Sequence, residues 1–390
     1  MRPSIAEVSA IYDAEQAAGR KAHTLADVPG TYEAITDEWL TAVVCRNAPG
    51  AAVTAHQVVD RSDGSSNRAR IRLTYNDAGN KAGLPPTVFC KGVVTKKNRV
   101  LQAVCGGAKT EPDIFNLVRN VVNIETPVHI HAAYDPKTYA YMVVMQDMGG
   151  ISDFCNEKSV INRAQAEKIC NTLAKLHARY YESPDLGTAK LPFKTWPEFW
   201  ADAVDGNPGW EEACDSAVEA AVDVIPPGVY KRRSEIWAKT QLSVARHNVL
   251  PKTLTHCDVH LGNWYKAGNG DMGVTDWQAA SVGHWSRDFI YAMSTTLAIE
   301  DRRAWFDDLL NLYLAKMVEY GAPKLNRDDA MLNIRQQLMT TLAFWTITLR
   351  PAPNMPPMQP ESISYALIKR ISAAMDDMDS LDALDRKSVV

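Results

Sequence analysis

The strands that this sequence predicts lie almost entirely within residues 51–147, and this separation of strands from helices constrains the fold more than any other feature. RARIRLTY alternates in the two-residue period of a half-buried strand, and TVFCKGV predicts another short strand. HIHAAYD and YAYMVVM flank the turn residues PKT and predict a hairpin. Beyond Gly150 helical patterns dominate instead. The chain therefore predicts an α+β fold with a small β-rich lobe followed by a larger, mainly helical lobe.

Three segments follow from this division, because a chain of 390 residues is longer than one compact core usually holds. We expect residues 1–50 to form a helical N-terminal extension, residues 51–147 the β-rich lobe and residues 148–390 the helical lobe. The sequence predicts helices in ITDEWLTAVV (opened by Thr36 or Asp37), over 110–121 and in NRAQAEKICNTLAKLHARYY, WPEFWADAV, DSAVEAAVDVI, KRRSEIWAKTQLSVARHNVL, RAWFDDLLNLYLAKMVEYG and RDDAMLNIRQQLMTTLAFWTITLR.

Composition removes several classes of function. The formal charge is −4 and no Lys/Arg cluster stands out, so the chain lacks the basic footprint of a nucleic-acid-binding protein. No apolar run reaches the roughly 18 residues that a membrane span needs, and the N-terminus lacks the pattern of a signal peptide. The seven cysteines are scattered and form no CxxC pair, which favours reduced thiols. We expect a cytoplasmic enzyme or binding protein.

The stretch HCDVHLGN, residues 256–263, concentrates polar side chains in what the sequence predicts to be a loop. A zinc site built on His256 and His260 is disfavoured, because their spacing suits a helix whereas Gly262 favours a loop, and no cysteine pair supplies further ligands. A polar surface turn is the simplest alternative. Phosphoryl transfer is a more specific one.

Phosphoryl transfer to a hydroxyl needs a carboxylate that orients the hydroxyl and takes its proton, together with oxygen ligands for Mg²⁺. Asp258, Asn263 and Asp276 supply these groups in that order, and the step of five residues from Asp258 to Asn263 is that of the kinase catalytic loop. The sequence thus predicts Asp258 as the catalytic base, with Asn263 and Asp276 as metal ligands.

HxDxxxxN followed by DWQ resembles the aminoglycoside phosphotransferase and choline kinase branch of the protein-kinase-like fold. LAKLHA at residues 173–178 supports the resemblance, which covers roughly residues 57–293. Gln278 and the segment GHWSRDFIYAM, with Asp288, are most similar to the ecdysteroid-kinase-like subgroup. The resemblance implies a bilobal protein-kinase-like fold, with ATP and Mg²⁺ as cofactors. It also implies that Asp288 braces the catalytic loop and that His256 supports the loop backbone.

The resemblance implies a lysine on a strand of the small lobe that holds the nucleotide phosphates and pairs with a helix glutamate. Lys91 lies among apolar residues in TVFCKGV, and Glu111, at the start of the helix predicted over 110–121, is its expected partner. The alternative is an edge-strand charge and a first-turn acid that favours the helix dipole.

A turn that covers the phosphates is expected between the first two strands, where backbone amides and hydroxyls make an anion cradle. It lacks the GxGxxG of protein kinases. The residues predicted to form it are Gly64, Ser65, Ser66 and Asn67.

The adenine edge is expected to pair with the main chain of MVVMQDMGG, at the Gln146 carbonyl and the Met148 N–H. The family often has Glu-Asp-Leu where this chain has Gln146, Asp147 and Met148, which changes little because backbone groups do the recognition. Cys257 also departs from the family, which more often has glycine at that position.

The sequence therefore predicts a kinase that phosphorylates a hydroxyl of a small molecule. The many aromatic residues of the helical lobe favour a hydrophobic or aromatic, steroid-like alcohol, whereas an aminoglycoside would require carboxylates and choline an aromatic cage. A nucleotide-binding pseudokinase that serves as an interaction module is the alternative of another class. A protein kinase is disfavoured by the missing GxGxxG and the lack of an APE-like segment. The oligomeric state is left open.

Overall fold

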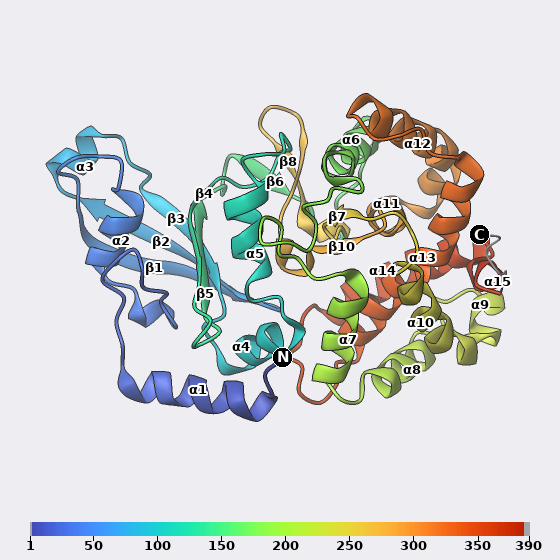
Figure 1. Cartoon of the computed structure of the whole chain (residues 1–390), viewed down its shortest axis with the longest axis horizontal. Helices are drawn as coiled ribbons and strands as arrows, with labels where there is room; N and C mark the ends of the chain where they lie inside the picture. The colour runs from blue at the N-terminus through green and yellow to red at the C-terminus, as the bar shows by residue number, and fades with distance from the viewer. Residues whose placement is uncertain (1, 386–390) are drawn as a thin grey trace. The chain divides into compact units, whose positions relative to one another are not determined.

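The computed structural model describes residues 2–385, and the chain divides into two compact units (Figure 1). The first unit comprises Met1–Val118, Pro127–Gly150 and Asn354–Met358, and the second comprises Arg119–Thr126, Ile151–Pro353 and Gln359–Val390. The elements of the first unit are α1 (Ile5–Ala18), η1 (Tyr32–Ala34), α2 (Asp37–Val44), β1 (Val53–Asp63), β2 (Asn67–Tyr75), α3 (Asp77–Lys81), β3 (Thr87–Gly92), α4 (Lys96–Cys105), α5 (Thr110–Asp113), η2 (Ile114–Val118), β4 (His129–Tyr134) and β5 (Tyr141–Gln146).

The first unit is built on an antiparallel sheet of five strands in the order β1-β2-β3-β5-β4. Every strand predicted from the sequence is present, including the hairpin of β4 and β5. In β2 the residues alternate between buried and more exposed positions, as the sequence period predicts. Helix α2 begins after Thr36, whose hydroxyl accepts a hydrogen bond from the Trp39 N–H, and its apolar face packs in the core of the sheet.

Helix α4 was not predicted, although both of its ends have sequence signals. The Thr95 hydroxyl caps its first turn, and Gly106 ends it in the left-handed conformation with φ 76°. Every residue from Asn98 to Cys105 is buried, polar residues included. Its buried polar residues Asn98, Arg99 and Gln102 form hydrogen bonds with distant segments, which no local pattern shows.

The single helix predicted over 110–121 is wrong in its extent. The structure has the short helix α5, followed by the π-helical turn η2 that ends at Val118. Pro112 lies in the first turn of α5, where proline is tolerated, and the helical hydrogen bonds change to the π pattern from Ile114. Glu111 is nevertheless in the first turn, as predicted.

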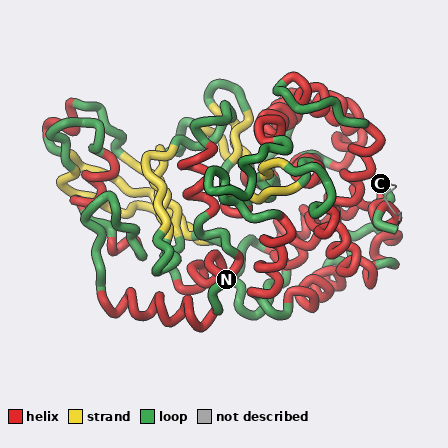
Figure 2. The backbone as a smooth tube through the Cα atoms, viewed as in Figure 1, coloured by secondary structure: helices red, strands yellow, loops and turns green. Residues whose placement is uncertain are grey.

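The second unit is mainly helical and carries two small antiparallel sheets, β6-β8-β9 and β7-β10. Figure 2 shows strands concentrated in the first unit and helices in the second. The elements are β6 (Ser152–Phe154), α6 (Arg163–Tyr180), α7 (Trp196–Gly206), α8 (Trp210–Ala220), α9 (Pro227–Lys231), η3 (Arg233–Glu235), α10 (Ile236–Arg246), β7 (Thr253–Thr255), η4 (Leu261–Asn263), β8 (Trp264–Ala267), β9 (Met272–Val274), η5 (Trp277–Ala279), β10 (Ser281–Gly283), α11 (Ser286–Thr296), α12 (Ile299–Glu319), α13 (Arg327–Leu349), α14 (Glu361–Asp377) and α15 (Ser380–Ala383).

The long helices predicted from the sequence correspond to α6, α7, α8, α10, α12 and α13, so the α+β fold class is confirmed. Helices α11 and α14 were not predicted. All residues of α11 are buried, polar ones included. Within residues 2–385, no helix is both long and apolar enough to cross a membrane.

Candidate active site

A buried ion pair joins β3 to α5 in the first unit. The Lys91 ammonium lies 2.8 Å from Oε1 of Glu111, and their side chains are 5% and 1% exposed. The Tyr141 hydroxyl lies 3.4 Å from the other oxygen of Glu111. Removing two charges from water is costly, so a buried lysine requires a partner such as this carboxylate. The contact expected from the sequence is therefore present.

Helix α4 supports the turn between β1 and β2 through side-chain hydrogen bonds. Within the turn, the Gly64 N–H donates to the Ser66 carbonyl over 3.0 Å. The Asn98 amide donates to the Gly64 carbonyl at 2.6 Å, and the Gln102 amide donates to the Ser65 carbonyl at 3.1 Å. Carbonyl groups of the turn accept the hydrogen bonds from α4, so α4 fixes the geometry of the turn.

Asn67, which was predicted in the same turn, begins β2 and is fully buried. Its amide nitrogen donates to Asp63 at 2.6 Å, and its amide oxygen accepts from the N–H groups of Val94 and Thr95 at 2.8 and 3.2 Å. Both ends of the Asn67 amide are thus occupied by the protein itself.

The segment predicted to recognise the adenine begins where β5 ends, at Gln146. The Asp147 carboxylate accepts hydrogen bonds from the Gly149 N–H at 3.0 Å and from Nε of Arg70 at 2.7 Å. Burial acts to raise the pKa of Asp147, but these hydrogen bonds outweigh it and hold that pKa below its ordinary value. The backbone around Met148 is therefore anchored to β2 by a charged pair.

In the second unit, residues 256–263 form a loop that leaves β7 and ends in the 3-10 turn η4. Cys257 adopts φ 65°, in the left-handed region where a β-carbon is unfavourable. This geometry explains why glycine would suit the position. The Cys257 side chain is fully buried, with its sulfur 3.1 Å from the Thr255 hydroxyl.

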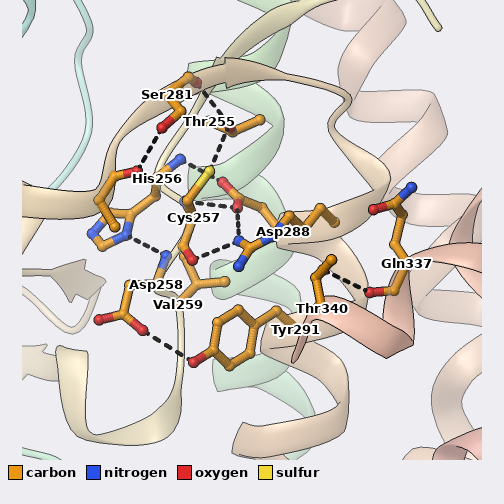
Figure 3. A network of polar contacts seen from close by, with 12 residues as sticks. Thr255, His256, Cys257, Asp258, Val259, Ser281, Asp288, Tyr291, Gln337 and Thr340 are labelled. Atoms are coloured by element: carbon orange, nitrogen blue, oxygen red, sulfur yellow. Dashed lines mark hydrogen bonds and ion pairs between the residues drawn. The ribbon is translucent and has the colours of Figure 1, made fainter. Parts of the chain in front are cut away.

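The side chain of Asp288, at the start of α11, holds the backbone of the 256–263 loop (Figure 3). Its two oxygens accept hydrogen bonds from the N–H groups of His256 and Cys257 at 2.6 and 2.9 Å, and His177 lies 3.2 Å away. Arg287 binds the Cys257 carbonyl at 2.5 Å. Burial acts to raise the pKa of Asp288, yet the hydrogen bond with His177 and the nearby Arg287 charge keep that pKa below its ordinary value.

His256 links the loop to the segment that carries Asp276. Its Nδ1 accepts a hydrogen bond from the Asp258 N–H at 3.2 Å, so Nε2 carries the proton and donates to the Thr275 carbonyl at 3.0 Å. Burial lowers the pKa of His256, which keeps the ring neutral in this role. The expected support of the loop backbone by His256 is confirmed.

The two predicted metal ligands, Asn263 and Asp276, lie on neighbouring segments that are joined by hydrogen bonds. Nδ2 of Asn263 donates to the Asp258 carbonyl at 2.7 Å, and the Asn263 carbonyl accepts from the Thr275 N–H at 2.8 Å. Asp276 follows directly, with φ 66°. A left-handed aspartate is uncommon, and backbone strain of this kind concentrates at functional sites. The structure thus brings Asp258, Asn263 and Asp276 into one connected loop system.

Two residues beside Asp258 were missed by sequence reasoning. Oδ1 of Asp258 accepts a hydrogen bond from the Tyr291 hydroxyl at 3.0 Å, and Nε1 of Trp345 lies 3.0 Å from the same hydroxyl. Tyr291 stands three residues after Asp288 on α11, a spacing that places both on one helix face and could have identified it. Trp345 comes from α13 and has no local sequence signal.

Three buried histidines and one half-buried histidine predict a marked dependence of stability on pH. Burial lowers the pKa of His131 to about 4 and of His247 to about 3, and it also lowers the pKa of His256 and, strongly, of His284. The unfolded chain therefore binds protons first as pH falls below about 6.5. We expect the free energy of unfolding to be constant between about pH 7 and 8 and to fall below about pH 6.5, by roughly 1 kcal/mol per pH unit for each histidine.

Denaturant unfolding followed by tryptophan fluorescence between pH 7 and 5 measures this slope, since carboxylates begin to protonate only below about pH 5. The substitution His247→Asn should reduce the slope, whereas His23→Gln, at an exposed position, should leave it unchanged. A slope that is the same in all three proteins would show that His247 titrates normally in the folded state.

Comparison with known proteins gives the family. The family model described as "Phosphotransferase enzyme family" matches residues 119–325, a little over half of the chain. No curated protein sequence matches the chain.

Among solved structures, a candidate aminoglycoside phosphotransferase from Ralstonia eutropha is similar with a TM-score of 0.50 and 11% identity, covering 89% of this chain and 97% of that one. A choline kinase from Cryptosporidium parvum (TM-score 0.49, 10% identity, 88% and 96% covered) and an ethanolamine kinase from Plasmodium vivax (0.48, 11%, 84% and 83%) are also similar. At these identities the first of them shows a shared fold and nothing more. The extent of the family match is decisive: this chain belongs to the phosphotransferase enzyme family and is a phosphotransferase.

Proposed function

We propose that the protein transfers the γ-phosphate of ATP to a hydroxyl of a small molecule, with Asp258 as the base. The observation that carries this proposal is the loop geometry. Nδ2 of Asn263 lies 2.7 Å from the Asp258 carbonyl and 3.3 Å from its carboxylate, so a carboxylate and an amide are held side by side. His256 and Asp288 fix the backbone of the same loop. A preorganised arrangement of this kind is what phosphoryl transfer requires.

The donor set fits Mg²⁺. Because the Asn263 nitrogen is used by the Asp258 carbonyl, the Asn263 amide presents its oxygen as the cation ligand, and Asp276 adds a carboxylate. Mg²⁺ is a hard cation that takes oxygen ligands, usually a few carboxylates together with phosphate oxygens. When bound, it would neutralise charge on the nucleotide phosphates.

In the first unit, Lys91 would contact the nucleotide phosphates, with Glu111 fixing its position. The backbone of Gly64, Ser65 and Ser66 would cover them, and the main chain of Gln146 and Met148 would bind the adenine. For Asn67 we propose a positioning role, since its amide is already bound by the protein at both ends.

The acceptor is proposed to be a hydrophobic or aromatic alcohol, as in the ecdysteroid-kinase-like subgroup. Cys257, which precedes Asp258, belongs to a cluster rich in aromatic residues. Trp237 and Phe344, which pack against this cluster, are only partly buried, and such rings favour an apolar acceptor. The carboxylates of Asp307 and Asp308, which an aminoglycoside would need, pair with arginines instead. The cluster consists of Trp196, Phe199, Trp200, Val244, Cys257, Ala279 and Ala343, with Val204, Trp237 and Phe344 packed against it.

Nucleotide binding is tested by thermal unfolding with and without ATP and Mg²⁺. At a ligand concentration one hundred times Kd, we expect stabilisation of about 2.7 kcal/mol. The substitution Lys91→Met should remove most of this shift, measured against the variant's own ligand-free Tm, because the phosphates lose their cation. Lys97→Met, at an exposed position on α4, is the matched control and should keep the full shift.

The absence of any ATP-dependent shift in the unmodified protein would contradict both the kinase and the pseudokinase alternatives. A shift without ATP consumption, across a panel of steroids, phenols, aminoglycosides and choline, would favour the pseudokinase. Consumption with an aminoglycoside or with choline alone would contradict the proposed acceptor class but not the proposed chemistry.

A further inference from the structure

We infer that Tyr291, supported by Trp345, is a positioning residue that fixes the orientation of the Asp258 carboxylate. The inference rests on the proposed function of Asp258 and deepens it. The three residues come from the 256–263 loop, α11 and α13, and the exposed fractions of Tyr291 and Trp345 are 1% and 3%. Figure 3 shows the Tyr291 hydroxyl directed at the carboxylate.

The direction of each hydrogen bond follows from the chemistry of the groups. An indole N–H can only donate, so the Tyr291 oxygen accepts from Nε1 of Trp345 at 3.0 Å. The phenol proton is then left to donate to Oδ1 of Asp258, also at 3.0 Å, and an ionised carboxylate can only accept. Trp345 therefore sets the rotation of the Tyr291 hydroxyl, and Tyr291 sets the rotation of the carboxylate.

The electrostatic surroundings agree with this arrangement. Burial and then the charge of Asp258 raise the pKa of Tyr291 well above its ordinary value, so the phenol is a permanent donor. His256 and His260 of the same loop also lie beside Asp258. Arg287 of α11 binds the carbonyl of the preceding residue, Cys257.

The two oxygens of Asp258 consequently differ. Oδ1 is bound by Tyr291, whereas Oδ2 has only longer contacts, 3.3 Å to Nδ2 of Asn263 and 3.9 Å to Nε2 of His260. We assign Oδ2 as the oxygen that receives the acceptor's proton. As the acceptor oxygen bonds to the γ-phosphorus of ATP and the bond from that phosphorus to ADP breaks, the hydroxyl proton moves to Oδ2 and afterwards leaves to solvent.

The substitution Tyr291→Phe removes the donor and keeps the ring, so it tests the inference directly. Aspartate-selective ¹³C NMR of the ligand-free protein at neutral pH, with the Asp258 signal assigned by its loss in Asp258→Asn, reports the environment of the Asp258 carboxyl carbon. We expect that signal to move in Tyr291→Phe, because a hydrogen bond to the carboxylate is lost. Phosphate release from ATP and Mg²⁺, with water as acceptor, should fall about tenfold at neutral pH.

Two further variants complete the test. Trp345→Phe removes the indole donor together with part of the ring system, and it should move the Asp258 signal in the same direction by a smaller amount. Tyr365→Phe is the matched control, because this tyrosine of α14 donates to the Ala220 carbonyl and should leave both readouts unchanged. If Tyr291→Phe does not fold, the Trp345→Phe measurement decides.

An unchanged Asp258 signal in Tyr291→Phe would overturn the inference, even if phosphate release falls, because a merely structural role lowers the rate without a direct contact at that carboxylate. Failure of the proposed function gives a different result. In that case Asp258→Asn itself would retain phosphate release, while the NMR signal would still report whether Tyr291 contacts the carboxylate.

Discussion

Asp258→Asn should lower the rate of phosphoryl transfer by about 10²–10⁴-fold, the contribution typical of a positioned general base. The expected loss is chemical rather than structural. Asparagine keeps an oxygen that can accept from the Tyr291 hydroxyl, and the backbone contacts of the loop with His256 and Asp288 do not involve the replaced atom. The rate is measured as ADP formation with an acceptor found by screening, and as phosphate release with water.

The ATP-dependent thermal shift of Asp258→Asn should remain close to that of the unmodified protein, since Asp258 is not proposed to bind the nucleotide. Asp271→Asn is the matched control, because Asp271 is an exposed acid in the loop between β8 and β9 of the same unit. Transfer that persists at a similar rate in Asp258→Asn would show that another group takes the proton.

Asp288→Ala should cost about 3–5 kcal/mol of stability, because it leaves buried donors and a buried cation without their acceptor. The backbone N–H groups of His256 and Cys257 lose both hydrogen bonds to the carboxylate, and Arg287 loses a negative charge 3.9 Å away. Since the same carboxylate holds the loop that carries Asp258, catalysis should fall along with stability.

Urea unfolding followed by tryptophan fluorescence measures the loss, with the midpoint and slope compared with those of the unmodified protein. Asp308→Ala provides the control. Its side chain is 70% exposed and pairs with Arg163 at 3.4 Å, so its removal should change stability by no more than about 0.5 kcal/mol. Equal stabilities of the two variants would mean that the Asp288 network is energetically unimportant.

The strands and the amphipathic helices were predictable because one face of each is buried and the other is not. The alternation in β2 and the capping threonine before α2 are local features that the sequence displays directly. In helices α4 and α11, which were missed, polar residues are buried as well, so burial does not follow the polar and apolar pattern of the sequence.

In the candidate site, too, some features were predictable from local sequence and others were not. The sequence by itself determined the chemical groups and their spacing, because Asp258, Asn263 and Asp276 lie within one short segment whose loop brings them together. It also determined the pair of Lys91 and Glu111, since an ammonium among apolar strand residues requires a carboxylate nearby.

Only the tertiary structure decided how those groups are held. Tyr291 reaches Asp258 from 33 residues away in the sequence, and Trp345 reaches Tyr291 from a further 54. The left-handed backbone of Cys257 became apparent only in the folded loop. Hydrogen bonds between distant segments depend on how helices pack, and packing is a property of the whole core that no local pattern records.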